Sequence, residues 1–365
     1  MSIDDFFSFE PTAKRIEDLE TPVPIIDIDI VDRNLKRWQK RADAIGIANR
    51  PHIKTHKMVP LAKYQVALGA RGITVQKLGE AEVMADAGVD DILISFNILG
   101  ASKLKRLADL ACRTKVTTVA DNTTVVSGLG QAGAEAGQDI AVLVECDTGA
   151  GRNGVQTPTA AAALAREINT TPGVIYRGLK TYPSPGTRTA AESFLVETRD
   201  LIAADGLETE IVSTGGSPDM WRDEGLSIAT EYRPGTYVFF DRSLVTRGTC
   251  NWSDCAANVL ATVVSRPTPE RALIDAGSKA LTMDLLGLEG YGTVHALDDA
   301  PLYDLNEEHG YLDVSRLNEK PTVGDLVRVT PNHICPVINL FDRVVFVRGD
   351  EVLGAVPVDA RGKVH

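Results

Sequence analysis

The feature that most constrains this chain is a regular alternation of two sequence patterns between Val23 and about Tyr237. Short apolar segments rich in β-branched residues alternate with longer segments that have amphipathic helical spacing. This alternation predicts parallel strands joined by helices through right-handed crossovers. The expected strands are 25–30, 49–54, 72–76, 91–95, 116–120, 140–147, 177–182, 210–214 and 228–232. Their number is about the eight that close a (β/α)8 barrel of the TIM type.

The helical segments between these strands support the same α/β fold class. The expected helices include 31–45, 79–88, 103–112, 158–168 and 190–204. Helix 158–168 has a clear start, because Thr157 is placed as N-cap and Pro158 occupies the first helical position. An open doubly wound sheet is the alternative, but no GxGxxG motif follows the first strand to support a dinucleotide site.

The pattern changes after Tyr237, which predicts a second domain. Helical periodicity stops there, and strand-like segments at 259–265, 271–276, 325–329 and 343–348 alternate with Gly- and Pro-containing turns. We therefore expect a barrel over residues 20–240, followed by a C-terminal mostly-β domain over 241–365 that also includes residues 1–19.

Composition excludes several classes of function. The chain has 365 residues, of which 44% are hydrophobic and 24% charged, as in ordinary globular proteins. A net charge of −12 argues against nucleic acid as a partner. No apolar run approaches the roughly 20 residues that span a bilayer. The acidic N-terminus without an apolar core and five scattered cysteines predict a cytoplasmic protein with reduced thiols.

The segment 50–57, RPHIKTHK, is the first candidate for chemistry. It follows a short expected strand, so Lys54 is placed at the strand's carboxyl end, where β/α barrels carry their active sites. A lysine beside His52, His56 and other cations is expected to have a depressed pKa and to serve as a nucleophilic amine. The alternative is a basic loop on the surface.

Three further segments follow expected strands and could bind an anionic group. Segment 146–154, CDTGAGRNG, could bring Arg152 close to a planar anion, and an ordinary tight turn is the alternative. Segment 213–217, STGGS, offers successive backbone N–H groups and hydroxyls that suit a phosphate. Segment 233–237, RPGTY, could complete the same nest. Gln76 and Tyr182 also end strands, and each taken alone favours a structural role over a functional one.

The last candidate is the pair His333 and Cys335 in segment 331–336, PNHICP. If this segment is a strand, residues two apart project to the same face about 7 Å apart along the backbone. Such a pair suits two ligands of one divalent metal, with open positions left for water or substrate. A buried core cysteine beside an unrelated histidine is the alternative.

Taken together, these motifs resemble the D-threonine aldolase / D-serine dehydratase family of fold-type III pyridoxal-phosphate enzymes, over nearly the whole chain. The resemblance implies an alanine-racemase-like barrel with a C-terminal β domain, and a homodimer. Lys54 would hold the cofactor covalently and act as base at Cα, and His56 and Arg152 would be further catalytic residues. The resemblance also implies a set of cofactor-binding residues: Lys54, Gln76, Arg152, Tyr182, Ser213, Thr214, Gly215, Gly216, Gly235, Thr236 and Tyr237.

His333 and Cys335 would bind the divalent metal that captures the β-hydroxyl of a D-3-hydroxy amino acid. In the family, aldolases generally pair this histidine with Asp, and dehydratases pair it with Cys. Cys335 therefore favours dehydration of D-serine, D-threonine or 3-hydroxyaspartate to a 2-oxo acid and ammonia. A soft thiolate also favours zinc over magnesium or manganese.

Other activities remain open on the sequence alone. Retro-aldol cleavage to glycine and an aldehyde is the main alternative, although Pro183 stands where aldolases tend to carry a histidine. The loop 182–186, YPSPG, matches neither subgroup. An amino-acid racemase would not need a metal. A non-catalytic cofactor carrier of the small-barrel type would lack the residues after Tyr237.

Overall fold

The computed structural model describes residues 1–297 and 300–365, which divide into two compact units. The barrel unit comprises Trp38–Lys54, Ala62–Gly235 and Lys363–His365. The β unit comprises Met1–Arg37, Thr55–Leu61 and Thr236–Gly362. The chain thus passes between the units several times, whereas the sequence predicted a barrel over 20–240 and a β domain over 241–365 together with residues 1–19.

The barrel unit is built on eight parallel strands. They are β2 (Ala48–Asn49), β3 (Ile73–Val75), β4 (Asp91–Ile94), β5 (Lys115–Ala120), β6 (Ile140–Cys146), β7 (Val174–Thr181), β8 (Ile211–Thr214) and β9 (Glu231–Tyr232). Their order is β2-β9-β8-β7-β6-β5-β4-β3. An isolated parallel bridge between His52 and Thr74 joins the two ends of this row and closes it into a barrel. The expected (β/α)8 architecture is therefore confirmed.

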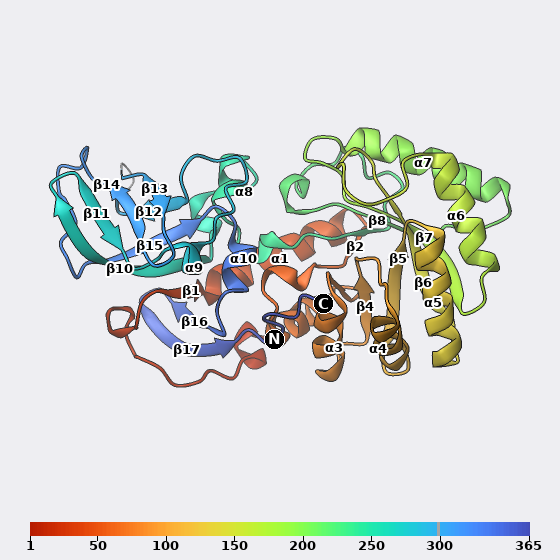
Figure 1. Ribbon diagram of the computed structural model, residues 1–365, viewed down its shortest axis with the longest axis horizontal. Helices are drawn as coiled ribbons and strands as arrows, with labels where there is room; N and C mark the ends of the chain where they lie inside the picture. Colours follow the sequence, from red (N-terminus) through yellow and green to blue (C-terminus); the bar gives the residue numbers. More distant parts are fainter. Residues whose placement is uncertain (298–299) are drawn as a thin grey trace. The chain divides into compact units, whose positions relative to one another are not determined.

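Helices connect these strands and lie outside them (Figure 1). They are α2 (Val59–Ala67), α3 (Leu78–Asp86), α4 (Ala101–Ala111), α5 (Thr123–Ala136), α6 (Pro158–Thr170) and α7 (Arg188–Ala204). The start of α6 is as expected, because the Thr157 hydroxyl accepts the Ala160 N–H and Pro158 takes the first helical position. The division between the units falls within α1 (Ile28–Ala44) and within α2.

The barrel core combines apolar packing with buried charge. Leu93, Val119, Leu143 and Ile211 form one hydrophobic cluster, with side chains from β4, β5, β6 and β8. Arg50, directly after β2, is buried and donates at 2.7 Å to both Glu231 of β9 and Asp91 of β4. Because a buried guanidinium needs compensating charge, this triad ties together strands that are far apart in the sequence.

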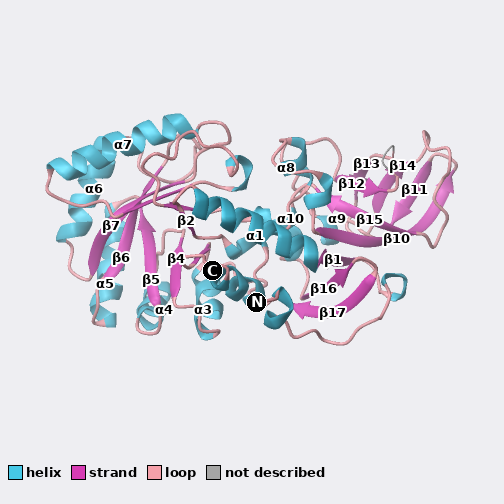
Figure 2. Ribbon diagram, turned by 180° about the vertical axis from the view of Figure 1, so that it is seen from behind, coloured by secondary structure: helices cyan, strands magenta, loops and turns pink. Residues whose placement is uncertain are grey.

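The β unit is a nine-stranded sheet with few and short helices (Figure 2). Its strands are β1 (Val23–Asp27), β10 (Ala257–Thr268), β11 (Arg271–Ile274), β12 (Gly292–His295), β13 (Leu302–Leu305), β14 (Gly310–Asp313), β15 (Leu326–Pro331), β16 (Arg343–Arg348) and β17 (Glu351–Pro357). Its helices include α8 (Arg242–Thr246), α9 (Ser278–Leu281) and α10 (Ile334–Ile338). The expected C-terminal mostly-β domain is confirmed.

One strand assignment from the sequence is wrong. Residues 25–30 were expected to be the first barrel strand, but β1 lies in the β unit, where it pairs antiparallel with β10 and parallel with β16. The strand ends at Asp27, and α1 begins at the next residue. A buried apolar strand has the same sequence pattern in either sheet, so periodicity could not identify its partners. Within the described residues, no helix is long and apolar enough to cross a membrane.

Candidate functional site

The carboxyl ends of the barrel strands bring the candidate residues of the barrel unit to one end of the sheet. Gln76 directly follows β3, Tyr182 follows β7 and Gly215 follows β8. Asp147 follows β6, and Arg233 follows β9. Because all eight strands are parallel, these positions share the end at which β/α barrels carry their chemistry.

Lys54 is more exposed to solvent than its neighbours in the chain. It lies in a single 3-10 turn, Ile53–Thr55, a few residues beyond β2. Every residue from Asn49 to Met58 is buried except Lys54, which is partly exposed. The segment is therefore not the surface loop that was the alternative, and its one accessible side chain is the expected nucleophile.

A hydrogen-bonded chain fixes the backbone beside Lys54. The Gln76 amide nitrogen donates to the Ser95 carbonyl at 2.9 Å, and the Gln76 Oε1 lies 3.1 Å from His52 Nε2. The other ring nitrogen of His52 accepts the Lys54 N–H in a long bond of 3.4 Å. Burial and the charge of Lys54 hold the pKa of His52 well below its usual range, so this ring is neutral and donates to Gln76. Sequence reasoning gave Gln76 a cofactor role but missed this link to His52.

His56 was predicted as a catalytic residue, and its surroundings favour a structural role. Its side chain is completely buried, and its Nδ1 accepts the Met58 N–H at 3.1 Å. An imidazole that accepts a backbone N–H two residues ahead stabilises the turn after Lys54.

The glycine-rich loop after β6 presents Arg152 on a rigid support. One carboxylate oxygen of Asp147 accepts the N–H groups of Gly149, Ala150 and Gly151 at 2.8–3.1 Å. Burial raises the pKa of Asp147, but these bonds and one from Gln156 outweigh burial and lower it. The exposed Arg152 guanidinium lies 4.7 Å from the centre of the Tyr182 ring, which brings together two of the predicted residues.

Gly215 and Gly216 form a cradle that admits no side chain. A Cβ on Gly215 would lie 2.2 Å from the Tyr232 ring, and one on Gly216 would lie 2.7 Å from the Tyr182 ring. Gly215 also has a φ of +90°, which glycine adopts without strain. The Gly235 N–H donates to the Ser217 hydroxyl at 3.2 Å, so the two segments predicted to share one anion nest do meet.

Ser213 does not contribute its hydroxyl to this nest. The hydroxyl is completely buried, donates to Glu231 and accepts from Arg233 at 2.5 Å. Thr214 is also buried, and its carbonyl accepts the Arg233 N–H. These two residues therefore fix the end of β8 from which the cradle begins, and the anion would contact the backbone of the glycines that follow.

Sequence reasoning missed a buried lysine in the barrel. Lys180 of β7 donates to Glu145 of β6 at 2.6 Å, and both side chains are buried. Burial lowers the pKa of Lys180 to about 8, even though Glu145 opposes this shift. The buried Arg233 donates to the Thr181 carbonyl on the same strand. Lys180 lies in the expected strand 177–182, and Arg233 lies in the segment 233–237. The sequence pattern did not indicate that either side chain would be buried.

The predicted metal ligands lie in the β unit, in a helix start and not in the expected strand. Strand β15 ends at Pro331, His333 is the N-cap of α10, and Cys335 lies in its first turn. The two side chains nevertheless share a hydrogen bond. Burial lowers the pKa of His333, but Cys335, Asp284 and Asp241 outweigh burial and raise it to about 10. Burial raises the pKa of Cys335, but His333 and two hydroxyls outweigh burial and lower it.

The surroundings of Cys335 and His333 suit a metal-binding pair. The hydroxyls of Thr55 and Thr236 lie 3.1 and 3.5 Å from the Cys335 sulfur, and both stabilise a thiolate. His333 Nδ1 lies 2.6 Å from the Asp284 carboxylate, which leaves Nε2 for Cys335. A cysteine sulfur and an imidazole nitrogen are both common ligands of divalent zinc, so the donor chemistry fits a divalent metal. Among residues 1–297 and 300–365, no third His, Cys, Asp or Glu completes a protein-only metal cluster.

Thr236 and Tyr237 belong to the β unit and form a 3-10 turn directly after Gly235. Tyr237 is buried.

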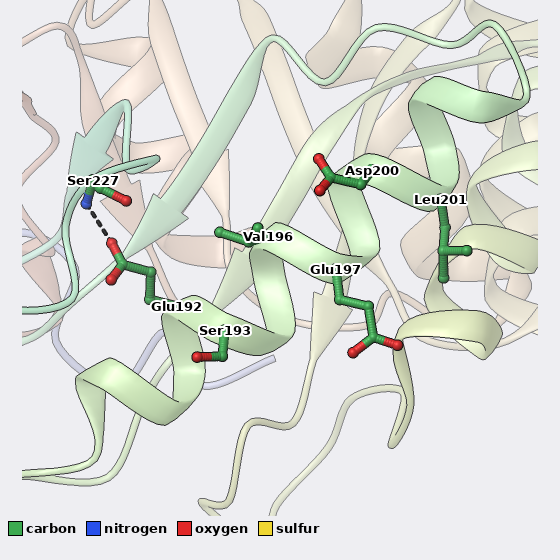
Figure 3. Close-up of a pocket in the computed structure, with 7 residues that line it drawn as sticks. All are labelled: Glu192, Ser193, Val196, Glu197, Asp200, Leu201 and Ser227. Carbon is green, nitrogen blue, oxygen red and sulfur yellow. Dashed lines mark hydrogen bonds between the residues drawn. The ribbon is translucent and has the colours of Figure 1, made fainter.

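A separate hollow lies along α7 of the barrel unit (Figure 3). Carboxylates of Glu192, Glu197 and Asp200 line it, and Glu192 accepts the Ser227 N–H. Its lining is acidic and lacks a cation, so it does not suit a phosphate.

Two family models match the chain. The model described as "Alanine racemase, N-terminal domain" matches residues 26–243. The model described as "Putative serine dehydratase domain" matches residues 256–347. The first covers the barrel strands and their connecting helices, and the second covers the segment that contains His333 and Cys335.

Relatives match over almost the full length. D-threonine aldolase from Arthrobacter sp is 34% identical, with 94% of this chain and 93% of the relative covered. D-threo-3-hydroxyaspartate dehydratase from Delftia sp. (strain HT23) is 32% identical, with 87% and 91% covered. The crystal structure of D-threonine aldolase from Filomicrobium marinum superposes with a TM-score of 0.87 at 31% identity, covering 98% and 100% of the chains.

A further solved structure is a cysteine-to-alanine variant of the dehydratase in its metal-free form, with a TM-score of 0.82 at 29% identity and 94% and 99% covered. The relatives thus include both aldolases and dehydratases. Together with the family models, the turn that contains Lys54 and the cradle of Gly215 and Gly216, these relatives identify the chain as a member of a known family. It belongs to the D-threonine aldolase / D-serine dehydratase family of fold-type III pyridoxal-phosphate enzymes, and it is hence a lyase.

Proposed function

We propose that this lyase dehydrates D-3-hydroxy amino acids and uses zinc together with pyridoxal phosphate. The observation that carries the proposal is the buried Cys335 side chain two residues from His333, with the Thr55 and Thr236 hydroxyls 3.1 and 3.5 Å from its sulfur. A thiolate and an imidazole are the donors that zinc prefers, whereas a carboxylate would suit manganese or magnesium better. In this family, a cysteine at that position accompanies the dehydratases.

The cofactor-binding residues fit an aromatic phosphate ester. We propose that Lys54 holds the cofactor covalently and that the backbone of Gly215, Gly216 and Gly235 binds its phosphate. Arg152 and Tyr182 would contact its ring, with Gln76 in support. We assign Ser213 and Thr214 to the support of this nest, and Thr236 and Tyr237 to the turn that follows it. When bound, pyridoxal phosphate withdraws electrons from the substrate Cα.

The chain's own residues then divide the work of the reaction. Lys54 is the base that removes the Cα proton, because it is the one accessible amine in a buried turn. His333 and Cys335 would hold the metal, which would supply Lewis acidity toward the β-hydroxyl group of the substrate. Loss of the Cα proton and of hydroxide from Cβ is elimination of water. Addition of water to the resulting imine releases ammonia and the 2-oxo acid, so D-threonine would give 2-oxobutanoate.

Retro-aldol cleavage is the second candidate, because D-threonine aldolase is 34% identical over nearly the whole chain. That reaction needs a base for the β-hydroxyl proton. The residue after Tyr182 is the buried Pro183, which has no titratable side chain. This favours dehydration over cleavage.

Product analysis tests the choice. The protein loaded with pyridoxal phosphate and zinc is given D-threonine, and ammonia with 2-oxobutanoate is the expected result. Glycine with acetaldehyde would overturn the dehydratase assignment in favour of the aldolase. Activity that persists after removal of metal with a chelator would contradict the role of His333 and Cys335.

We also propose a homodimer in a reducing compartment. The five cysteines are all free, as expected where thiols stay reduced. Three apolar side chains of one loop, Met283, Leu285 and Leu286, are 39–56% exposed, and they are candidates for burial against a second copy. Sedimentation at micromolar concentration would test the dimer.

A further inference from the structure

The loop that follows α9 is held beside the end of β15 by buried polar contacts. Asn332, 2% exposed, donates from its amide to the Gly290 carbonyl at 2.8 Å. Arg242 donates to the Asn332 side-chain oxygen at 2.8 Å and to the Glu289 carbonyl at 2.7 Å. A loop fixed at these points has a defined position, and Asp284 lies on it.

The helix start that contains His333 is fixed as well. Asp241 is completely buried, and one of its carboxylate oxygens accepts the Ile334 N–H at 3.2 Å. Its other oxygen accepts from the Ser243 hydroxyl at 2.7 Å. His333 and Asp284 are therefore both held by neighbours in the same unit, and their contact does not depend on a mobile surface chain.

The contact itself has the geometry of a carboxylate that orients a metal-binding histidine. Asp284 Oδ2 lies 2.6 Å from His333 Nδ1, so Nδ1 carries the proton and donates it to the carboxylate. In the neutral ring the lone pair is then on Nε2, which is the atom available for the shared site with Cys335. Metal-binding histidines commonly donate their second N–H to such a carboxylate, which fixes the ring and makes the other nitrogen a better donor.

We propose that Asp284 is a positioning residue for the metal, acting through His333 without binding the metal itself. This inference rests on the proposed metal site at His333 and Cys335. Loss of an outer carboxylate typically weakens metal binding 10–100-fold. We expect the lower end of that range, about tenfold, because the Asp284 side chain is 39% exposed and water can replace part of its contact.

Metal titration of the cofactor-loaded protein tests the proposal. Zn2+ affinity is measured by competition with a chromogenic chelator, and Co2+ binding by its thiolate charge-transfer band, which reports on Cys335. Asp284→Ala should weaken both metals about tenfold while the Co2+ band keeps its shape, because Cys335 still binds. Asp284→Asn should lose less, because its amide oxygen can still accept the Nδ1–H.

The control is Glu289→Gln, which removes a negative charge from the same loop but leaves the backbone carbonyl that contacts Arg242. It should keep the affinity of the unaltered protein. Unchanged affinity in both Asp284 variants would overturn the positioning role, as would a loss in Glu289→Gln equal to that in Asp284→Ala. If the unaltered protein binds neither metal, the proposed metal site itself is wrong, and this outcome is distinct from the other two. If Asp284→Ala does not fold, Asp284→Asn decides.

Discussion

At the scale of single residues, Lys54 is the amine on which the assignment depends. Lys54→Ala should remove the visible absorption of bound pyridoxal phosphate and abolish turnover. The other candidate amine, Lys180, is buried and bound to Glu145 at 2.6 Å, so it should not replace Lys54. Absorption spectra after dialysis would check this, with Lys63→Ala, an exposed lysine of α2, as the control that keeps the band. Cofactor found covalently on Lys180 after borohydride reduction would contradict the prediction.

We expect Cys335 to determine which metal its proposed pair with His333 selects. Cys335→Asp replaces a soft thiolate with a hard carboxylate, so the variant should bind less zinc and a larger fraction of manganese. The measurement is metal content after incubation of the protein with equal amounts of both ions. Cys250→Ala, a buried cysteine elsewhere in the same unit, is the control and should keep the original ratio. An unchanged ratio in Cys335→Asp would refute the ligand assignment.

The sequence indicated candidate site residues that lie in distinctive motifs, and it missed the residues that contact and support them. Lys54, Arg152 and Tyr182 were found because they follow strands. Asp284 lies 49 residues from His333 and has no motif of its own, so only tertiary structure reveals the contact. Asp147 was part of a quoted motif, but its role as acceptor of three backbone N–H groups depends on the fold of the loop.

At the scale of elements, the turn after β8 depends on glycine because two aromatic rings are packed against it. Gly215→Ala would place a Cβ 2.2 Å from the Tyr232 ring in a backbone conformation with φ of +90°. We expect a loss of about 1–3 kcal/mol in the free energy of unfolding, as for other overpacked sites, together with weaker binding of pyridoxal phosphate. Urea unfolding of the cofactor-free protein measures the first effect, and cofactor titration the second.

Gly206→Ala separates backbone strain from overpacking. Gly206 has a φ of +78°, but a Cβ there would meet no atom within 4 Å. This control should lose only the cost of strain, roughly 1 kcal/mol, and should bind the cofactor normally. If both variants lose the same stability and the same cofactor affinity, the cradle does not depend on the ring contacts.

The same scale shows where sequence patterns were ambiguous. Segment 331–336 was interpreted as a strand, but residues Ile334–Ile338 form a helical turn. Pro336 is tolerated there because the first turn of a helix does not need its N–H groups. The helix nevertheless keeps His333 and Cys335 together, since the N-cap and the second helical residue are close in space. The proposed pairing of these two residues therefore does not depend on the secondary structure that was expected for the segment.

At the scale of the whole molecule, the order of strands within each sheet was less predictable than their existence. Eight of the nine strands expected before Tyr237 belong to the barrel. The first belongs to the other sheet, because β1 is placed by pairing with β10 and β16, which lie more than 200 residues away. Local sequence patterns cannot indicate such distant partners. Because β1 pairs with these strands, residues 1–37 belong to the β unit.

From the position of β1 we predict which unit loses protection from hydrogen exchange when a core residue is substituted. Ile26 is fully buried between β10 and β16, so Ile26→Ala should cost about 2–5 kcal/mol and loosen the sheet of the β unit. Hydrogen exchange followed by mass spectrometry should rise first in peptides from those two strands. Leu143→Ala, which removes an equally buried side chain from β6, is the matched control and should raise exchange in β5 and β7 instead. Faster exchange of the barrel strands in Ile26→Ala, with β10 and β16 still protected, would place β1 in the barrel as the sequence pattern first indicated.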